Sequence, residues 1–180
     1  MRLLPAEIAD KYNVNELEVI KALRVLDSKQ AILFAMSGKM GSGKDTVGDK
    51  VSVEKSLSKY DIIQTSYATP LRMEITNIVQ EYNEGAPLSE MSEKYDISVE
   101  EITTLVKLLN GDSIYDRTAD SRLAIQYWGT DVRRKQNNNY WVNKIVELIV
   151  DEVNKGKSIY VTDVRFPNEA NMVNEMGGDC

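Results

Sequence analysis

The residues with the clearest chemical potential lie at positions 38–46, where the sequence reads GKMGSGKDT. Gly38, Gly43 and Lys44 have the spacing GxxxxGK, in which glycines let backbone N–H groups surround a phosphate and the lysine adds a positive charge. An apolar run at residues 31–36 predicts a buried strand before this stretch, and residues 45–59 predict a helix after it. The alternative is an ordinary glycine turn. Strand, loop and helix in this order favour a phosphate-binding loop.

The position after Lys44 departs from the commonest form of this motif. Asp45 stands where a Ser or Thr hydroxyl usually binds magnesium, and Thr46 follows it. We therefore expect the metal to be held through water or by a carboxylate elsewhere. The chain contains no histidine, which removes the commonest general base and most zinc sites. Its chemistry must use carboxylates, lysines, arginines, backbone amides and a metal.

The composition narrows the class of protein. A chain of 180 residues with 42% hydrophobic and 28% charged residues is typical of one soluble globular domain with an appendage. No apolar run is long enough for a membrane span, and no signal peptide is expected. A single cysteine, Cys180, fits a reducing cytoplasm. The net charge of −6 argues against nucleic acid as a partner, so an anionic substrate must meet a local cluster of cations.

The hydrophobic pattern predicts the elements that position the chemistry. Further strands are predicted at residues 61–66 and 158–162, which gives the strand-helix-strand order of a parallel α/β sheet. Asp163 and Arg165 follow the last of these strands, and ligands of such sheets bind beyond the carboxyl ends of the strands. Helices are predicted from Pro70 toward Tyr82 with Arg72 in the first turn, from Arg122 to Trp128, at residues 141–153, and from Pro167.

An internal repeat lies outside this pattern. The segment KYNVN at residues 11–15 matches KYDIS at residues 94–98, and apolar positions on both sides pair at the same offset. Each copy predicts two short helices joined by a turn. DNA recognition is one interpretation, but the second helices carry Glu16 and Glu18 in one copy and Glu100 and Glu101 in the other, which would repel phosphates. Packing on the main domain or on a partner is therefore favoured.

From residue 31 onward the chain resembles the bacteriophage deoxynucleoside monophosphate kinases of the P-loop kinase superfamily. The resemblance rests on GSGKDT at residues 41–46, ATPLR at 68–72, QYWGTDVRR at 126–134, the pair Tyr140 and Trp141, and DVRFPNE at 163–169. An aspartate after the loop lysine is usual in that family. The implied domains are a helical unit at residues 1–30 and a P-loop kinase-like domain at residues 31–180 with a helical insertion at about residues 87–110.

The resemblance implies transfer of the γ-phosphoryl group of ATP to a deoxynucleoside monophosphate, with Mg²⁺. The expected location is the cytoplasm, which is that of the host if the chain is encoded by a phage. The catalytic residues that it implies are Lys44, Arg165 and Asp163, with Asp163 also directing the metal. The residues implied to bind ATP are Gly41, Ser42, Gly43, Lys44, Asp45 and Thr46. Those implied to bind the monophosphate are Leu71, Arg72, Arg122, Gly129, Thr130, Trp141, Arg165 and Glu169. Family members continue into a further strand and an arginine-bearing lid; no arginine follows Arg165, so we expect that strand and lid to be missing.

Two alternative functions and two further questions stay open at the level of sequence. A P-loop kinase for a hydroxyl acceptor, such as dephospho-coenzyme A, would need a general base near the acceptor, for which Asp163 and Asp45 are candidates. A nucleotide-responsive DNA-binding or adaptor protein would use the two helical pairs instead. The sequence also leaves open whether the chain forms a homodimer and which bases it accepts.

Overall fold

The computed structural model describes residues 1–37 and 61–180. The predicted phosphate-binding loop and the helix predicted at residues 45–59 lie outside the described residues. Within them, the chain forms three parallel β-strands, eight α-helices and one π-helical segment, so the predicted mixed α/β class is confirmed. The chain divides into two compact units, Met1–Tyr67 with Val142–Cys180, and Ala68–Trp141.

The first unit is built on the parallel sheet. Strands β1 (Leu33–Ser37), β2 (Ile62–Ser66) and β3 (Ser158–Val164) have the order β1-β3-β2, so β3 is central. Its apolar run is buried on both faces, as expected of an inner parallel strand. Phe34 pairs with Tyr160 in register, and their rings stack with centroids 4.7 Å apart. All three predicted strands are confirmed, with ends shifted by one or two residues.

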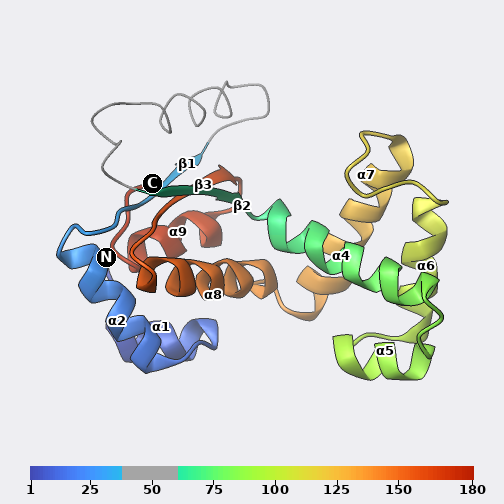
Figure 1. Cartoon of the computed structure of the whole chain (residues 1–180), viewed down its shortest axis with the longest axis horizontal. Helices are drawn as coiled ribbons and strands as arrows, with labels where there is room; N and C mark the ends of the chain where they lie inside the picture. The colour runs from blue at the N-terminus through green and yellow to red at the C-terminus, as the bar shows by residue number, and fades with distance from the viewer. Residues whose placement is uncertain (38–60) are drawn as a thin grey trace. The chain divides into compact units, whose positions relative to one another are not determined.

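The described part of the first unit also contains four helices: α1 (Pro5–Tyr12), α2 (Glu16–Asp27), most of α8 (Tyr140–Asn154) and α9 (Pro167–Glu175). Figure 1 shows α8 and α9 along one side of the three strands. The apolar stripe predicted on α8 is confirmed, since Val142, Ile145, Val146, Ile149 and Val153 are all buried. Helices α8 and α9 therefore supply the apolar side chains that pack against one face of the sheet.

The segment after α9 pairs with the free edge of β1. The Ala35 N–H donates to the Asp179 carbonyl at 2.8 Å, and the Asp179 N–H donates to the Leu33 carbonyl at 3.2 Å. The neighbouring Ile32 carbonyl accepts instead from Ile159 of β3. Backbone groups of successive residues in a strand point to opposite edges, so Asp179 lies on the edge of β1 that faces away from β3. A Cβ at Gly178 would lie 2.7 Å from the Leu33 carbonyl oxygen, so this approach requires glycine.

The second unit is helical. It contains α4 (Ala68–Asn83), α5 (Leu88–Tyr95), α6 (Val99–Leu109), α7 (Ala119–Gln126) and the π-helix η1 (Tyr127–Arg134), followed by the first two residues of α8. Among the described residues, every helix of the chain is too short or too polar to cross a membrane.

Two predicted helix starts in this unit were wrong. Helix α4 begins at Ala68, two residues before Pro70, because the N–H groups of a first turn have no acceptor within the helix and proline is tolerated there. Arg72 is consequently the fifth helical residue. Helix α7 begins at Ala119 rather than at Arg122, because the Thr118 side chain accepts a hydrogen bond from the Ser121 N–H and caps the helix.

The helix predicted to end at Trp128 also extends further than expected. Helix α7 continues directly into η1, and Gly129 lies inside that π-helix. Asp131 is likewise a residue of the interior of this π-helix. Single π-helical turns are frequent at functional sites, because the extra residue redirects the side chains around it.

The two copies of the repeat fold alike and attach to their units by the same contact. Asn13 and Asp96 end the first helix of each pair in the left-handed conformation, with φ of 54° and 52°. In the first copy, Lys11 Nζ and the Tyr12 hydroxyl both donate to Glu175 of α9. In the second, Lys94 Nζ and the Tyr95 hydroxyl both donate to Glu81 of α4, at 2.6 and 2.7 Å. We call this contact the Lys-Tyr-Glu clamp.

Candidate functional site

In the first unit, the candidate site lies at the carboxyl ends of β1 and β3. The register between these strands shifts near their ends: Ala35 pairs with Val161, but Ser37 pairs with Val164. One residue of β1, Met36, thus opposes two of β3, Thr162 and Asp163, and Asp163 lies in this bulge with φ of 63°. A left-handed conformation is uncommon for any residue except glycine, and such strained residues cluster at functional sites. The bulge turns the Asp163 carboxylate out of the ordinary alternation of the strand.

Arg165 forms a two-point ion pair with Asp163. Its Nε donates to Asp163 Oδ1 at 2.9 Å, and its terminal nitrogen lies 2.7 Å from Oδ2. The Arg165 side chain is 56% exposed, whereas that of Asp163 is 24% exposed. Such a pair holds the guanidinium in one orientation, from which its outer N–H groups can bind a second anion.

Glu169 fixes the backbone that carries this pair. Its side chain is buried, and its carboxylate accepts from the Arg165 N–H at 2.8 Å and from the Phe166 N–H at 3.2 Å. The Glu169 carbonyl accepts from the buried Tyr67 hydroxyl at 3.1 Å. In the structure Glu169 is therefore a buried cap of the first turn of α9.

The connections of the sheet single out the same place. The next described strand after β1 is β2, which lies beyond β3, whereas the chain after β3 passes through α9 and reaches the opposite edge of β1 at Asp179. The two neighbouring strands thus send their continuations in opposite directions. In open parallel sheets, this switch in direction leaves a crevice at the carboxyl ends of the two strands, where ligands bind. Asp163 and Arg165 stand at that end of β3.

The residues predicted to hold ATP, Gly41, Ser42, Gly43, Lys44, Asp45 and Thr46, lie outside the described residues, although they follow the carboxyl end of β1 in sequence. For magnesium, the chemistry of Asp163 fits: Mg²⁺ usually takes one or two carboxylates and completes its shell with phosphate oxygens and water. Within the described part of the chain, no group of three or more acidic, cysteine or histidine side chains could hold a metal by itself.

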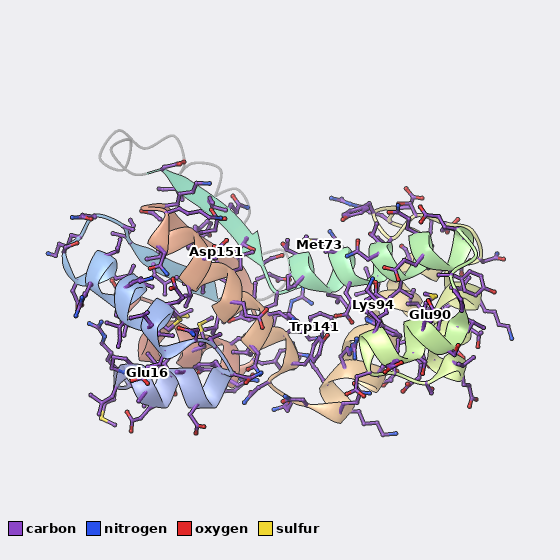
Figure 2. All side chains as sticks on the ribbon, turned by 60° about the horizontal axis from the view of Figure 1, so that its bottom comes forward. Glu16, Met73, Glu90, Lys94, Trp141 and Asp151 are labelled. Carbon is purple, nitrogen blue, oxygen red and sulfur yellow. The ribbon has the colours of Figure 1, made fainter. Side chains whose placement is uncertain are left out.

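The second unit contains the remaining predicted residues, and three of them pack together. The Trp141 indole N–H donates to the Gly129 carbonyl at 3.0 Å, and a Cβ on Gly129 would lie 3.1 Å from a methyl carbon of Leu71. Leu71, Gly129 and Trp141 are all buried. Figure 2 labels Trp141 near the start of α8. A side chain at position 129 would therefore require the Leu71 side chain to shift slightly.

The other predicted residues of this unit are more accessible. Arg122 and Thr130 are exposed, on α7 and η1. Arg72 is partly exposed, and its guanidinium carbon lies 6.0 Å from the centroid of the Tyr115 ring. The Arg72 Nε is buried and has no hydrogen-bond partner among the described residues. Asp163, Arg165 and Glu169 belong to the first unit, so the predicted set is divided between the two units.

The sequence did not reveal the polar centre of the second unit, which is Glu74. One carboxylate oxygen of Glu74 accepts from the Trp128 indole N–H at 2.8 Å and from Arg133 Nε at 2.6 Å, and the other accepts from the Tyr140 hydroxyl. The Arg133 side chain is 2% exposed, and its guanidinium lies 5.2 Å from the Trp128 ring and 4.6 Å from the Tyr140 ring. We call these four residues the Glu74 cluster. It ties η1 to α4 and α8 and so fixes the segment that carries Gly129 and Thr130.

One signal for the Glu74 cluster was present in the sequence. Trp128, Arg133 and Tyr140 belong to the motifs quoted above, and a buried arginine requires a carboxylate partner. Nothing in their spacing identifies that partner as Glu74, which lies 54 residues before Trp128.

Comparison with known proteins found no counterpart: no family model, curated protein or solved structure matches the chain.

Proposed function

We propose that the chain is an ATP-dependent deoxynucleoside monophosphate kinase with a P-loop kinase core. It transfers the γ-phosphoryl group of ATP to a deoxynucleoside monophosphate and releases ADP and the deoxynucleoside diphosphate. The observation that carries the proposal is the switch in strand connections between β1 and β3. The GSGKDT sequence follows β1 directly in the chain, and the Asp163–Arg165 pair follows β3, so the proposal assigns both to the crevice expected at this switch.

The residue chemistry supports this reaction. The acceptor is a phosphate oxygen whose second pKa is about 6, so most of it is deprotonated at neutral pH and no general base is needed. A protein without histidine can therefore catalyse the transfer. Catalysis then depends on bringing two polyanions together and on offsetting their charge, for which Lys44 and Arg165 supply cations.

Each proposed residue has a separate task. An oxygen of the monophosphate forms a bond to the γ-phosphorus while the bond from that phosphorus to the oxygen bridging to the β-phosphate breaks. Lys44 binds the phosphates of ATP, and Arg165, oriented by Asp163, binds the acceptor phosphate. Bound Mg²⁺ would neutralise charge on the ATP phosphates, with Asp163 holding it directly or through water. Glu169 keeps the turn that carries Asp163 and Arg165 in place.

The test is a coupled assay of ADP formation with ATP, Mg²⁺ and each of the four deoxynucleoside monophosphates. We expect turnover with at least one of them, its abolition by Lys44→Ala with the fold intact by circular dichroism, and loss of kcat/KM for the monophosphate in Arg165→Ala. Turnover unchanged in Lys44→Ala would refute the ATP loop. An unchanged kcat/KM in Arg165→Ala would refute the acceptor side of the site.

A further inference from the structure

The second unit contains a pocket that none of the predicted site residues lines. One wall is a face of α4 formed by residues 75, 76, 79, 80 and 83, with residue 84 just after the helix, and the other is residue 109 with residues 112–115. Its volume is about 500 Å³, within the range of pockets for small molecules. Ile75, Leu109 and Ile114 are buried, so the floor of the pocket is apolar.

The charged side chains that line this pocket are both acidic. Among the described residues, its lining includes Glu84 and Asp112 but no lysine or arginine. Glu84 accepts a hydrogen bond from Gln80 Nε2 at 2.8 Å, whereas no hydrogen bond or ion pair joins the Asp112 carboxylate to another described residue. Asp112 is half-buried, and a carboxylate accepts hydrogen bonds but cannot donate them. The pocket therefore offers a ligand an acceptor that carries a negative charge.

Two helices end at this pocket. Helix α4 ends at Asn83 and α6 ends at Leu109, and both residues line the pocket. The C-terminal end of a helix carries a partial negative charge, equivalent to about half an elementary charge, which attracts cations. The last turn of α4 contains no basic residue, and Lys107 in the last turn of α6 is exposed and is not among the lining residues. The helix ends thus add to the negative potential that the two carboxylates create.

We propose that this pocket binds a small organic amine, in which a protonated amino group is attached to an apolar body. The apolar body lies on the buried floor, and the ammonium group donates a hydrogen bond to Asp112 near the ends of α4 and α6. The same negative potential disfavours ligands that carry phosphate. None of the residues proposed for phosphoryl transfer lines the pocket, so this inference does not depend on the function proposed above.

The two ends of the pocket differ, which sets the direction of the ligand. The Arg72 guanidinium lies 6.0 Å from the centroid of the Tyr115 ring, and Tyr115 lines the pocket. Arg72 lies about three helical turns before Asn83, which is roughly 16 Å along α4. The cation beside Tyr115 repels an ammonium group, and the helix end at Asn83 attracts it. We therefore expect the apolar body to contact Tyr115 and the ammonium group to lie toward Asn83.

The first experiment compares two probes that have similar apolar bodies and opposite charges. Phenylbutylamine is a cation at neutral pH, and phenylbutyrate is an anion. We expect the Kd of the amine to be lower than that of the carboxylate by about tenfold or more, measured by ligand-observed NMR titration of the full chain. Equal Kd values, or binding of neither probe, would overturn the inference. Displacement of the bound amine by a deoxynucleoside monophosphate would also overturn it, because the pocket would then belong to the nucleotide.

A second measurement separates the pocket from general attraction to a protein with a net charge of −6. Val79 lines the pocket, whereas Asn77 is an exposed residue of α4 that does not line it. Val79→Trp fills the pocket without changing a charge and should raise the Kd of the amine by about tenfold or more. Asn77→Trp, the matched control, should leave that Kd unchanged. An unchanged Kd in Val79→Trp would show that the amine binds elsewhere and would refute the proposal.

A third measurement tests the contact with Asp112 and covers the case in which Val79→Trp does not fold. Asp112→Asn keeps the size of the side chain and removes its charge. We expect it to raise the Kd of the amine by about fivefold or more and not to raise that of the carboxylate. Asp10→Asn is the matched control, because it removes one charge from an exposed residue of α1 and should leave both Kd values unchanged. Equal effects of the two substitutions on the amine would sink the inference.

Discussion

Asp163 combines an unfavourable backbone conformation with a carboxylate at the carboxyl end of β3. At φ of 63° an L-residue other than glycine gives up roughly 1–2 kcal/mol. Its ion pair with the exposed Arg165 returns at most about 1 kcal/mol. Strained residues of this kind cluster at functional sites, which agrees with the role proposed for the Asp163 carboxylate.

Replacing Asp163 should therefore separate stability from activity. We expect Asp163→Gly to change the free energy of unfolding by less than about 1 kcal/mol, because relief of the backbone offsets the lost ion pair. Phosphoryl transfer should fall at least tenfold, which corresponds to about 1.4 kcal/mol in the barrier. Urea unfolding and the coupled assay measure the two effects. Asp163→Val is the control for the backbone, and it should be less stable than the wild-type protein and than Asp163→Gly. Equal stability of the Val and Gly variants would contradict backbone strain at this position.

Glu74 is the residue whose loss should cost the second unit most. Its carboxylate serves three donors, and the partner charge on Arg133 is 2% exposed. Glu74→Gln leaves that charge buried without a counterion, which should lower the free energy of unfolding by about 3–5 kcal/mol in urea titrations. Glu81→Gln is the matched control, because it breaks a solvated pair and should cost less than about 1 kcal/mol. Similar losses in the two variants would contradict the role of burial.

At the scale of elements, the Lys-Tyr-Glu clamp explains why the repeated helical pairs share a Lys-Tyr sequence at the end of their first helix. Each pair is too short to form an isolated core, so it must bury its apolar face on another helix. Tyr12 and Tyr95 set the contact by donating to one carboxylate on that helix. Two copies with the same local sequence thus attach in the same way to two different units.

The stability that the Lys-Tyr-Glu clamp on α4 contributes should fall as the pH is lowered. The hydrogen bond from Lys94, followed by that from Tyr95, lowers the pKa of Glu81 from its ordinary value of 4.5. A lowered folded-state pKa contributes stability that is present above pH 4.5 and lost as the pH falls through the folded-state value. We therefore expect the stability difference between the wild-type protein and Glu81→Gln to shrink on acidification below pH 4.5, measured by urea unfolding at several pH values. A difference that stays constant with pH would contradict the clamp.

At the scale of the whole molecule, the charge distribution argues against nucleic acid as a ligand. The net charge is −6, and Glu16 and Glu100 are exposed at the start of the second helix of each repeat. Lys11 and Lys94, the cations nearest to the turns, are held in the clamps. The two helical pairs therefore have little positive charge left with which to bind the phosphates of a nucleic acid.

We accordingly expect no binding of the chain to a labelled DNA duplex in fluorescence anisotropy, even at low salt. Binding to duplex DNA depends on counterion release and is strongest at low salt, so this condition gives the DNA-binding alternative its best chance. A steep salt dependence of measurable binding would instead support the helical pairs as DNA readers.

The sequence alone determined most of the local structure. The apolar runs predicted all three described strands, the 3.6-residue periodicity predicted α8, and the repeat predicted two helical pairs with matching turns. These features depend on residues close together in the chain. The helix starts were less certain, because Thr118 and Pro70 allow more than one first residue and the capping contact decides between them.

Only the tertiary structure decided the features that join distant residues. The strand order, the bulge at Asp163 and the switch in direction between β1 and β3 depend on which strands pair, which no local pattern specifies. The partners of Glu74 lie 54 to 66 residues from it in sequence. The pocket beside α4 likewise arises from segments that meet only after folding. Spacing in the sequence limits which residues can share a helix face or a strand, whereas contacts between elements follow from burial of their apolar faces against one another.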